Sequence, residues 1–413
     1  MTAPADRPST TRKGVPRTMI SDAPPEHRRA PLDGLVVADL SRILAGPYCS
    51  MLLADMGATV IKVEGPGGDD TRTWMPPVKD GVSTYYLSVG RNKRSVTLDF
   101  RDPGDRDLAA ELLRRADVAI ENFRPGALAR FGLDYGSAAA ANPGLVYLSI
   151  TGFGSGEGAW LPGYDLIVQA VSGLMSLTGD ADGPAFRAGI SVFDVMAGLH
   201  GLIGVLAALQ QRNETGRGQH VEVNLLSSAM SGLVNQSGAY TAAGVVPTRM
   251  GNAHPSLFPY ETMPTADRDM IITAGNDRQF RALCSVLGIP EVADDPRFAT
   301  NADRTANREE LRPLLLAGLA KWKADDLFVA LNETGVPCGP INTIGEGVEL
   351  AESLGLAPRV ELGAGDRQVT LVRNPITFGD SELRYDLPPP EPGEHTDEIK
   401  AWLRAPAGAE AVG

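Results

Sequence analysis

The sequence predicts an α/β fold with a large domain, built on a mainly parallel sheet, and a smaller α+β domain. Short apolar runs alternate with helical patterns from residue 34 to about residue 225. The composition then changes, and helices predominate over strands up to about residue 335. A length of 413 residues favours more than one domain, and 43% hydrophobic residues suffice for sizeable cores.

A β-α-β unit of about thirty residues opens the regular part of the chain. Residues 35–40 are an apolar run typical of a buried strand, and the next strand is predicted over 59–64. The helix between them, over 46–56, is entered through Gly46-Pro47, and proline suits a first helical turn. The alternation continues with strands over 96–100, 118–121 and 145–150 and a helix over 105–116. This pattern indicates a parallel sheet with helices on both faces.

Later elements suggest the domain boundaries. A long helix is predicted over 191–211, and a strand over 220–225. The smaller domain is expected to contain a loop over 251–259, a strand over 270–274 and helices near 277–287, 307–321 and 324–334. Pro388-Pro389-Pro390 is read as a stiff linker before a last helix over 396–403. The predicted division is a tail (1–30), the first part of the large domain (31–215), a linker (216–235), the small domain (236–335), a linker and return to the large domain (336–405), and a tail (406–413).

Residues 1–30 are rich in Pro, Thr, Ser and Arg and have no apolar core, which predicts a disordered tail. A mitochondrial transit peptide is the alternative, because the segment carries several basic residues. Asp6, Asp22 and Glu26 count against it, since transit peptides are poor in acidic residues.

Charge and cysteine content exclude several classes of function. A net charge of −13 and a pI near 5.0 argue against nucleic acid or an anionic membrane as the main partner. The three cysteines are widely spaced and form no CxxC pair, so we expect a cytoplasmic protein in a reducing environment, with no metal site. No run is expected to reach the roughly eighteen apolar residues of a membrane span.

Three loops at the carboxyl ends of predicted strands are the candidate ligand site, since ligands of parallel sheets bind there. Residues 41–47, 122–126 and 151–154 are rich in Gly, Pro and Asn, which permits backbone contact with a phosphorylated ligand. No GxGxxG follows the first strand, and no GxxxxGK[ST] occurs in the chain. NAD-binding and P-loop functions therefore lose their main support.

The acidic turn from Thr178 to Pro184 lies between two apolar helical runs. Asp182 in this turn is the candidate nucleophile, because a carboxylate can attack an acyl group when water is excluded and N–H donors stabilise the oxyanion. The alternative is that Asp180 and Asp182 only form the turn, as Asp beside Gly usually does.

The chain resembles the family III CoA-transferases, also called the CaiB/BaiF family, over nearly all of residues 31–403. The resemblance rests on eight motifs in a fixed order: DLS with AGP (39–41, 45–47), LADMGA (53–58), VIKVE (60–64), RNKRS (91–95), ENFRPG (121–126), TGRGQ (215–219), GVPCGP (335–340) and GEHT (393–396). It implies a Rossmann-like large domain made from both chain ends, and an interlocked homodimer.

The implied activity is transfer of CoA from an acyl-CoA donor to a carboxylic acid, with closest likeness to succinyl-CoA:dicarboxylate CoA-transferases. Asp182 matches the family's nucleophile in this interpretation and would form aspartyl anhydride and aspartyl-CoA intermediates. One alternative is an α-methylacyl-CoA racemase, in which an Asp at the position of Asp194 pairs with a His. Tyr164 replaces that His here. Another alternative is a non-catalytic CoA-binding partner, and structural or catalytic roles stay open for Asp165 and Asp194.

The resemblance also implies which residues bind substrates, with CoA as a substrate and no permanently bound cofactor. One departure is Gly65-Pro66, where some relatives have a CoA-binding Arg; Arg72 is a possible replacement. Arg249 and His254, in a loop without the glycine run of oxalate-type members, are candidates for binding a distal carboxylate. The implied CoA contacts are Ile43, Leu44, Gly90, Arg91, Asn92, Lys93, Asn122, Phe123, Arg124, Arg130, Thr151, Gly152, Phe153 and Gly154.

Overall fold

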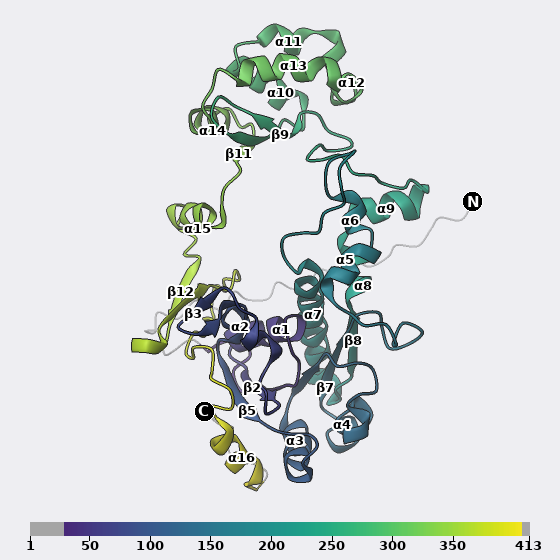
Figure 1. The fold of residues 1–413 in the computed structure, drawn as a ribbon, viewed down its shortest axis with the longest axis vertical. Helices are drawn as coiled ribbons and strands as arrows, with labels where there is room; N and C mark the ends of the chain where they lie inside the picture. Colours follow the sequence, from purple (N-terminus) through teal and green to yellow (C-terminus); the bar gives the residue numbers. More distant parts are fainter. Residues whose placement is uncertain (1–28, 407–413) are drawn as a thin grey trace, which may run out of the picture.

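The computed structural model describes residues 29–406, and its centre is a parallel six-stranded sheet (Figure 1). The strand order is β5-β2-β1-β6-β7-β8, and every neighbouring pair runs parallel. The strands are β1 (Val36–Asp39), β2 (Thr59–Glu64), β5 (Lys93–Thr97), β6 (Val118–Glu121), β7 (Val146–Thr151) and β8 (His220–Asn224). The predicted α/β class is confirmed.

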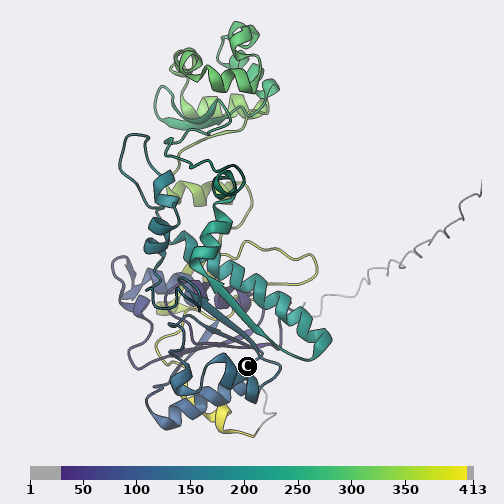
Figure 2. The same ribbon diagram turned by 90° about the vertical axis from the view of Figure 1, so that its right-hand side faces the viewer.

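Helices cover both faces of the sheet because its central strands are apolar on both sides. In β1, Val37 packs into one core with α1 (Ala45–Asp55) and α7 (Val192–Thr215). Its neighbours Val36 and Ala38 point to the other core, with α3 (Pro103–Arg115) and α16 (Thr396–Arg404). Figure 2 shows α7 running the length of one face. Alternation of side chains along a strand therefore builds two cores from one short run.

Two boundaries differ from the sequence prediction. Residues 216–235, predicted as a linker, contain edge strand β8 and α8 (Leu225–Gly232), because the backbone of β8 pairs with β7 in register from Tyr147 opposite His220. Strand β5 covers Lys93–Thr97 rather than residues 96–100. Its first residue is a buried cation, so an apolar run does not mark its start.

A second domain follows α9 (Val234–Ala243) and has its own core around Phe258, Phe280 and Phe298. Its antiparallel sheet has the order β11-β10-β9, from Cys338–Pro340, Asp269–Thr273 and Tyr260–Pro264. Five helices complete it: α10 (Asp277–Val286), α11 (Pro290–Asp294), α12 (Asn301–Ala306), α13 (Arg308–Leu319) and α14 (Ala324–Glu333). This is the predicted α+β region, and it lies apart from the large sheet (Figure 1).

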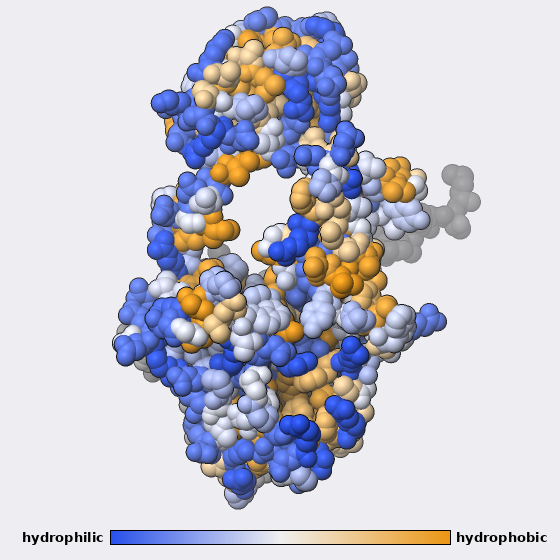
Figure 3. Space-filling model, viewed as in Figure 1, coloured by the Kyte–Doolittle hydropathy of each residue, from blue (hydrophilic) through white to orange (hydrophobic). Residues whose placement is uncertain are grey.

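The chain returns to the large domain through α15 (Ile344–Ser353), β12 (Arg359–Leu362) and β13 (Val369–Val372). A buried cluster fixes the return: Asp55 of α1 accepts hydrogen bonds from Arg91, Asn92 and Asn374. The two connections between the domains leave an opening through the molecule (Figure 3). A single chain therefore forms an open ring.

Helix α7 corrects the expectation about membrane spans. It has 24 residues, and one 18-residue window has a mean hydropathy of 1.9, so by length and composition alone it could cross a membrane. In the structure it packs against α1, β7 and β8, and 44% of that window is buried. Gly198 permits the close approach, because a Cβ there would lie 2.6 Å from the carbonyl oxygen of Ala45. Helix α7 is thus the central helix of the large domain.

Candidate active site

The strand order places the candidate site between β1 and β6. The chain leaves β1 towards β2 on one side, while β6 lies on the other side, so the loops after β1 and β6 diverge. Crevices at such a switch point are where open parallel sheets bind ligands. Two adjoining hollows lie here, and both are lined by Arg42 and Phe123.

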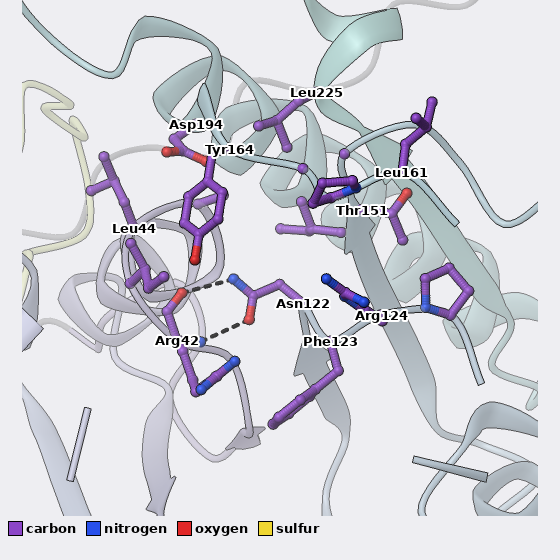
Figure 4. A pocket seen from close by; sticks show the side chains of 17 residues that line it. Arg42, Leu44, Asn122, Phe123, Arg124, Thr151, Leu161, Tyr164, Asp194 and Leu225 are labelled. Atoms are coloured by element: carbon purple, nitrogen blue, oxygen red, sulfur yellow. Dashed lines mark hydrogen bonds between the residues drawn. The ribbon is translucent and has the colours of Figure 1, made fainter. Parts of the chain in front are cut away.

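The first hollow, here called the switch-point pocket, has a volume of about 180 Å³ (Figure 4). The loops after β1, β6 and β7 contribute polar groups to its wall, and Asp194 at the start of α7 completes it. Its lining is Arg42–Ala45, Asn122–Pro125, Ile150–Gly152, Leu161–Tyr164, Asp194 and Leu225. It therefore gathers the carboxyl ends of several strands and one carboxylate in one place.

The second hollow, here called the outer pocket, has a volume of about 320 Å³. Three guanidinium groups line it, those of Arg42, Arg101 and Arg130, and aromatic rings accompany them. The Arg42 guanidinium lies 5.1 Å from the centre of the Phe123 ring, and that of Arg130 lies 4.6 Å from the centre of the Phe131 ring. Arginine forks and aromatic faces suit phosphates and a planar base.

Asp194 lies in the first turn of α7, where its side chain is half-buried in the wall of the pocket. Burial raises the pKa of Asp194 to about 7, and the nearby charge of Asp165 adds to this effect. No group within residues 29–406 donates a hydrogen bond to the Asp194 carboxylate. A partly desolvated carboxylate with free oxygens, in the wall of a pocket, is available to react.

Helix α5 (Asp165–Val171) fixes the position of Asp194. The Asp165 carboxylate accepts hydrogen bonds from the backbone N–H groups of Phe193, at 2.7 Å, and of Asp194, at 3.3 Å. Gln169 donates to Asp165 and to the carbonyl of Ile190, and it accepts from the N–H of Ala188. The start of α7 is thus held by side chains of α5.

The structure does not bring Asp182 to either pocket. Asp182 is exposed in the turn of residues 178–184, and the main contacts of that turn are backbone bonds, including that from Phe186 N–H to Thr178 O. No N–H donor of the described residues faces its carboxylate. The exposed position of Asp182 matches the alternative in which this residue only forms the turn. Of Asp165, Asp182 and Asp194, it is Asp194 that lines the switch-point pocket.

The predicted CoA contacts divide into four groups, of which residues 90–93 are the last. The switch-point pocket gathers seven of them: Ile43, Leu44, Asn122, Phe123, Arg124, Thr151 and Gly152. Arg130 lies in the outer pocket instead. Phe153 packs against the core, and the N–H of Gly154 donates to Thr151 Oγ1, so these two shape the loop after β7 without lining either pocket.

Residues 90–93 line neither of the two pockets, and their side chains have partners within the chain. Lys93 is 2% exposed and donates to Asp39 at 3.1 Å and to the carbonyl of Pro47 at 2.8 Å. Arg91 forms a buried pair with Asp55 at 2.7 Å, and Asn92 donates to the same carboxylate. Gly90 is buried close to Pro389. These donors already have partners, so they cannot serve a ligand without losing them.

Arg249 and His254 also lie outside both pockets. Arg249 Nε donates to the carbonyl of Asp180 at 3.2 Å, and His254 Nδ1 accepts from Ser256 N–H at 3.0 Å. Arg72, the possible substitute for a missing CoA contact, pairs with Glu64 at 2.7 Å and does not line the outer pocket.

Sequence reasoning missed Arg42 and Arg101 and set Asp194 behind Asp182. Arg42 is the only cation of the predicted ligand loop 41–47, so the sequence did contain a signal for it. Arg101 directly follows the strand predicted over 96–100, so its place at a carboxyl end was a signal too, but that loop was not among the three chosen.

Comparisons with known proteins agree with this architecture. The family model described as CoA-transferase family III matches residues 32–396. A succinate–glutarate CoA-transferase of Agrobacterium fabrum is 45% identical over 91% of this chain and 96% of its own length. An acetyl-CoA:oxalate CoA-transferase of Acetobacter aceti is 39% identical over 93% and 98%. The crystal structure of a CaiB/BaiF family protein from Brucella suis superposes with a TM-score of 0.82 at 44% identity, covering 91% of this chain and all of that one.

Proposed function

The chain belongs to CoA-transferase family III, and on that premise we propose that it moves CoA from an acyl-CoA donor, such as succinyl-CoA, to a dicarboxylic acid. Both named relatives have a dicarboxylate in their names, glutarate in one and oxalate in the other. The higher identity to the first favours a C4–C5 dicarboxylate over oxalate. Neither name identifies the acceptor of this protein.

We place CoA across the two adjoining pockets, with its phosphates in the outer one. Arg42, Arg101 and Arg130 would bind the phosphates in the outer pocket, where Arg42 and Arg101 would exchange their salt bridges with Asp70 and Asp99 for the ligand. The thioester would reach the switch-point pocket past Phe123. A protein of net charge −13 repels an anionic ligand at long range, so this local group of guanidinium ions is what makes binding favourable.

One observation supports the mechanism most: the half-buried carboxylate of Asp194 lies in the pocket wall and accepts no hydrogen bond from the described residues. We assign it as the nucleophile, in place of Asp182. An Asp194 oxygen attacks the thioester carbonyl and the C–S bond breaks. CoA leaves as thiolate, and the acyl group stays on Asp194 as a mixed anhydride. The thiolate then attacks the Asp194 carbonyl carbon, which gives an aspartyl-CoA thioester and releases the donor acid.

The second half repeats these steps in reverse order. The acceptor carboxylate attacks the aspartyl thioester and releases thiolate, and the thiolate attacks the acceptor's carbonyl in the new anhydride. The new CoA ester leaves, and the Asp194 carboxylate is restored. Each anhydride would be destroyed by water, so the pocket must be closed during turnover.

The N-terminus of α1 can stabilise the oxyanion of each step. Leu44 is the N-cap of α1, and its side chain offers no capping hydrogen bond. The first N–H groups of any helix lack intrahelical partners, and here these are the N–H groups of Ala45 and Gly46. Ala45 lines the same pocket as Asp194. Free backbone donors at a helix start favour negative charge.

A homodimer is also proposed, on the evidence of the ring-shaped chain. Apolar side chains are exposed on elements beside the opening (Figures 1 and 3): Leu166, Ile167 and Val171 on α5, and Ile344 and Leu354 at α15. Ile344 is 89% exposed. A second copy threaded through the opening would cover them. The cytoplasmic location and the absence of a permanent cofactor, nucleic acid or membrane partner stay predictions.

The test is to incubate the purified protein with succinyl-CoA and a panel of acids and to analyse the CoA esters by mass spectrometry. We expect glutaryl-CoA to form faster than butyryl-CoA. Exchange of the α-proton of a 2-methylacyl-CoA with deuterium, without any CoA transfer, would identify a racemase instead. CoA binding without either reaction would identify the non-catalytic alternative.

A further inference from the structure

The turn of residues 41–44, which joins β1 to α1, has its backbone held by side chains from three places. Asn122, after β6, accepts from Arg42 N–H at 2.8 Å and donates to Arg42 O at 2.7 Å. Lys62 of β2 donates to the carbonyl of Ser41 at 2.5 Å. Asp69, after β2, accepts from Ile43 N–H at 3.3 and 3.4 Å on its two oxygens. The turn is therefore clamped from both sides of the switch point.

Ile43 adopts a backbone conformation that its side chain disfavours. Its φ angle is +70°, in the left-handed region that suits glycine, and a β-branched residue is rarely found there. Ile43 also lines the switch-point pocket. Strained residues of this kind persist only where the surrounding contacts enforce them, and they concentrate at binding sites.

The groups that enforce this conformation are buried charges. Lys62 and Asp69 form an ion pair at 2.8 Å, with side chains 3% and 2% exposed. Burial opposes the charged form of Asp69, yet the charge of Lys62 and its hydrogen bonds lower the pKa of Asp69. Asp39 and Lys93 form a second buried pair beside it. A buried ion pair gains little stability over apolar packing of the same volume. What these two pairs contribute here is the geometry that they impose on the turn.

We propose that the Lys62–Asp69 pair is a positioning device: it holds Ile43 in the left-handed conformation and so keeps the switch-point pocket in its ligand-binding shape. The proposal rests on CoA as the ligand of that pocket. Lys62 and Asp69 act through the turn, which they contact by hydrogen bonds; they also line the outer pocket, but they do not contact the reacting atoms. Without the pair, Ile43 would relax towards ordinary φ values, and only a fraction of the molecules would present the pocket.

The test is a rescue experiment with CoA affinity measured by calorimetry. Asp69→Asn should weaken CoA binding at least tenfold, because the strained turn relaxes. Combining Asp69→Asn with Ile43→Gly should restore affinity to within threefold of Ile43→Gly alone, because glycine adopts φ +70° without strain. Combining it with Ile43→Ala should restore much less, since alanine still carries a Cβ. Equal affinities of Asp69→Asn and wild type, or equal rescue by Gly and Ala, would overturn the proposal.

The thermal midpoints of Ile43→Gly and Ile43→Ala give a second measurement that keeps the ion pair intact. Glycine should be the more stable variant at this position, the reverse of its usual effect. If alanine is the more stable, Ile43 is not strained and the proposal fails, even if Asp69→Asn does not fold. Ala357→Gly is the matched control: Ala357 has φ +44° outside both pockets, so this change should leave CoA affinity unaltered. Failure of the wild type to bind CoA would refute the proposed function instead.

Discussion

Asp182 and Asp194 illustrate what decides whether a carboxylate can be a nucleophile. Both lie near glycines in the same 36-residue stretch, 163–198, and the turn around Asp182 looks the more constrained in sequence. In the structure Asp182 is exposed, whereas Asp194 is desolvated in a pocket wall. Burial depends on which strands and helices meet at that point, and no local pattern reports it. The candidate loops were therefore predictable, but the choice among the carboxylates was not.

Replacing each carboxylate by its amide should separate the two residues. We expect Asp194→Asn to lower kcat at least a thousandfold, because the amide cannot form the anhydride. Asp182→Asn should retain at least a third of wild-type kcat, since its side chain has no contact with the pocket. Initial rates of glutaryl-CoA formation measure both. A large loss in Asp182→Asn with a small one in Asp194→Asn would reverse the assignment.

The pKa of Asp194 predicts a dependence of stability on pH. Folding raises this pKa from 3.8 to about 7, so the native state keeps a proton that the unfolded state releases between these values. The resulting stability is present at low pH and is lost as pH rises through 7. Asp194→Asn should lack this loss, so its stability should gain on that of the wild type as pH rises towards 7 and keep a constant advantage above that value. At about 1.4 kcal/mol per tenfold change in proton affinity, the gain is at most about 4 kcal/mol.

Urea unfolding of both proteins from pH 5 to pH 8.5 measures the effect. If the free energies of unfolding of the two proteins, plotted against pH, run parallel over this range, Asp194 is ionised in the native state throughout.

At the scale of elements, the sequence predicted all six strands of the large sheet, and one strand and three helices of the smaller domain. Apolar periodicity is local, and it located β1, β2, β6 and α10 to within a few residues. It misplaced β5, which opens with Lys93, a buried cation that is paired with the distant Asp39. The strand β8 was predicted, but it was placed in a linker because its pairing with β7 is a long-range contact.

The contact between α5 and α7 predicts a shift in the pH profile. Asp165→Asn removes the charge that helps to raise the pKa of Asp194, while the amide oxygen can still accept the N–H groups of α7. Burial stays, so the pKa of Asp194 should fall but remain above its ordinary value. The acid limb of kcat/KM should therefore move to lower pH.

Gln169→Ala is the matched variant for that profile. It removes hydrogen bonds to Ala188, Ile190 and Asp165 but leaves the charge of Asp165 in place, so it should lower kcat and move the acid limb far less than Asp165→Asn. An acid limb at the same pH in Asp165→Asn and wild type would show that Asp165 does not act on Asp194.

At the scale of the whole molecule, the ring shape could not be predicted from periodicity. The apolar faces of α5 and the start of α15 follow the same patterns as buried helices, yet they are exposed in the single chain. Arg249 and His254, predicted to bind a distal carboxylate, also lie away from the pocket in one subunit.

Light scattering after size-exclusion chromatography tests the proposed dimer. We expect a mass of twice 43.7 kDa at every concentration, since threaded subunits cannot separate without unfolding a domain connection. A monomer with full transferase activity would contradict the threaded arrangement and would leave the exposed faces of α5 and α15 unexplained.

The central claim is that CoA is carried on Asp194, and trapping the intermediate tests it most directly. Hydroxylamine added with succinyl-CoA should convert the activated carboxyl group to a hydroxamate. Trypsin then releases residues 188–212, in which Asp194 is the only acidic side chain, separately from residues 131–187, which contain Asp182. Tandem mass spectrometry should find the hydroxamate in the peptide of Asp194, and only when succinyl-CoA is present. A hydroxamate at Asp182, or in neither peptide while turnover continues, would contradict the account.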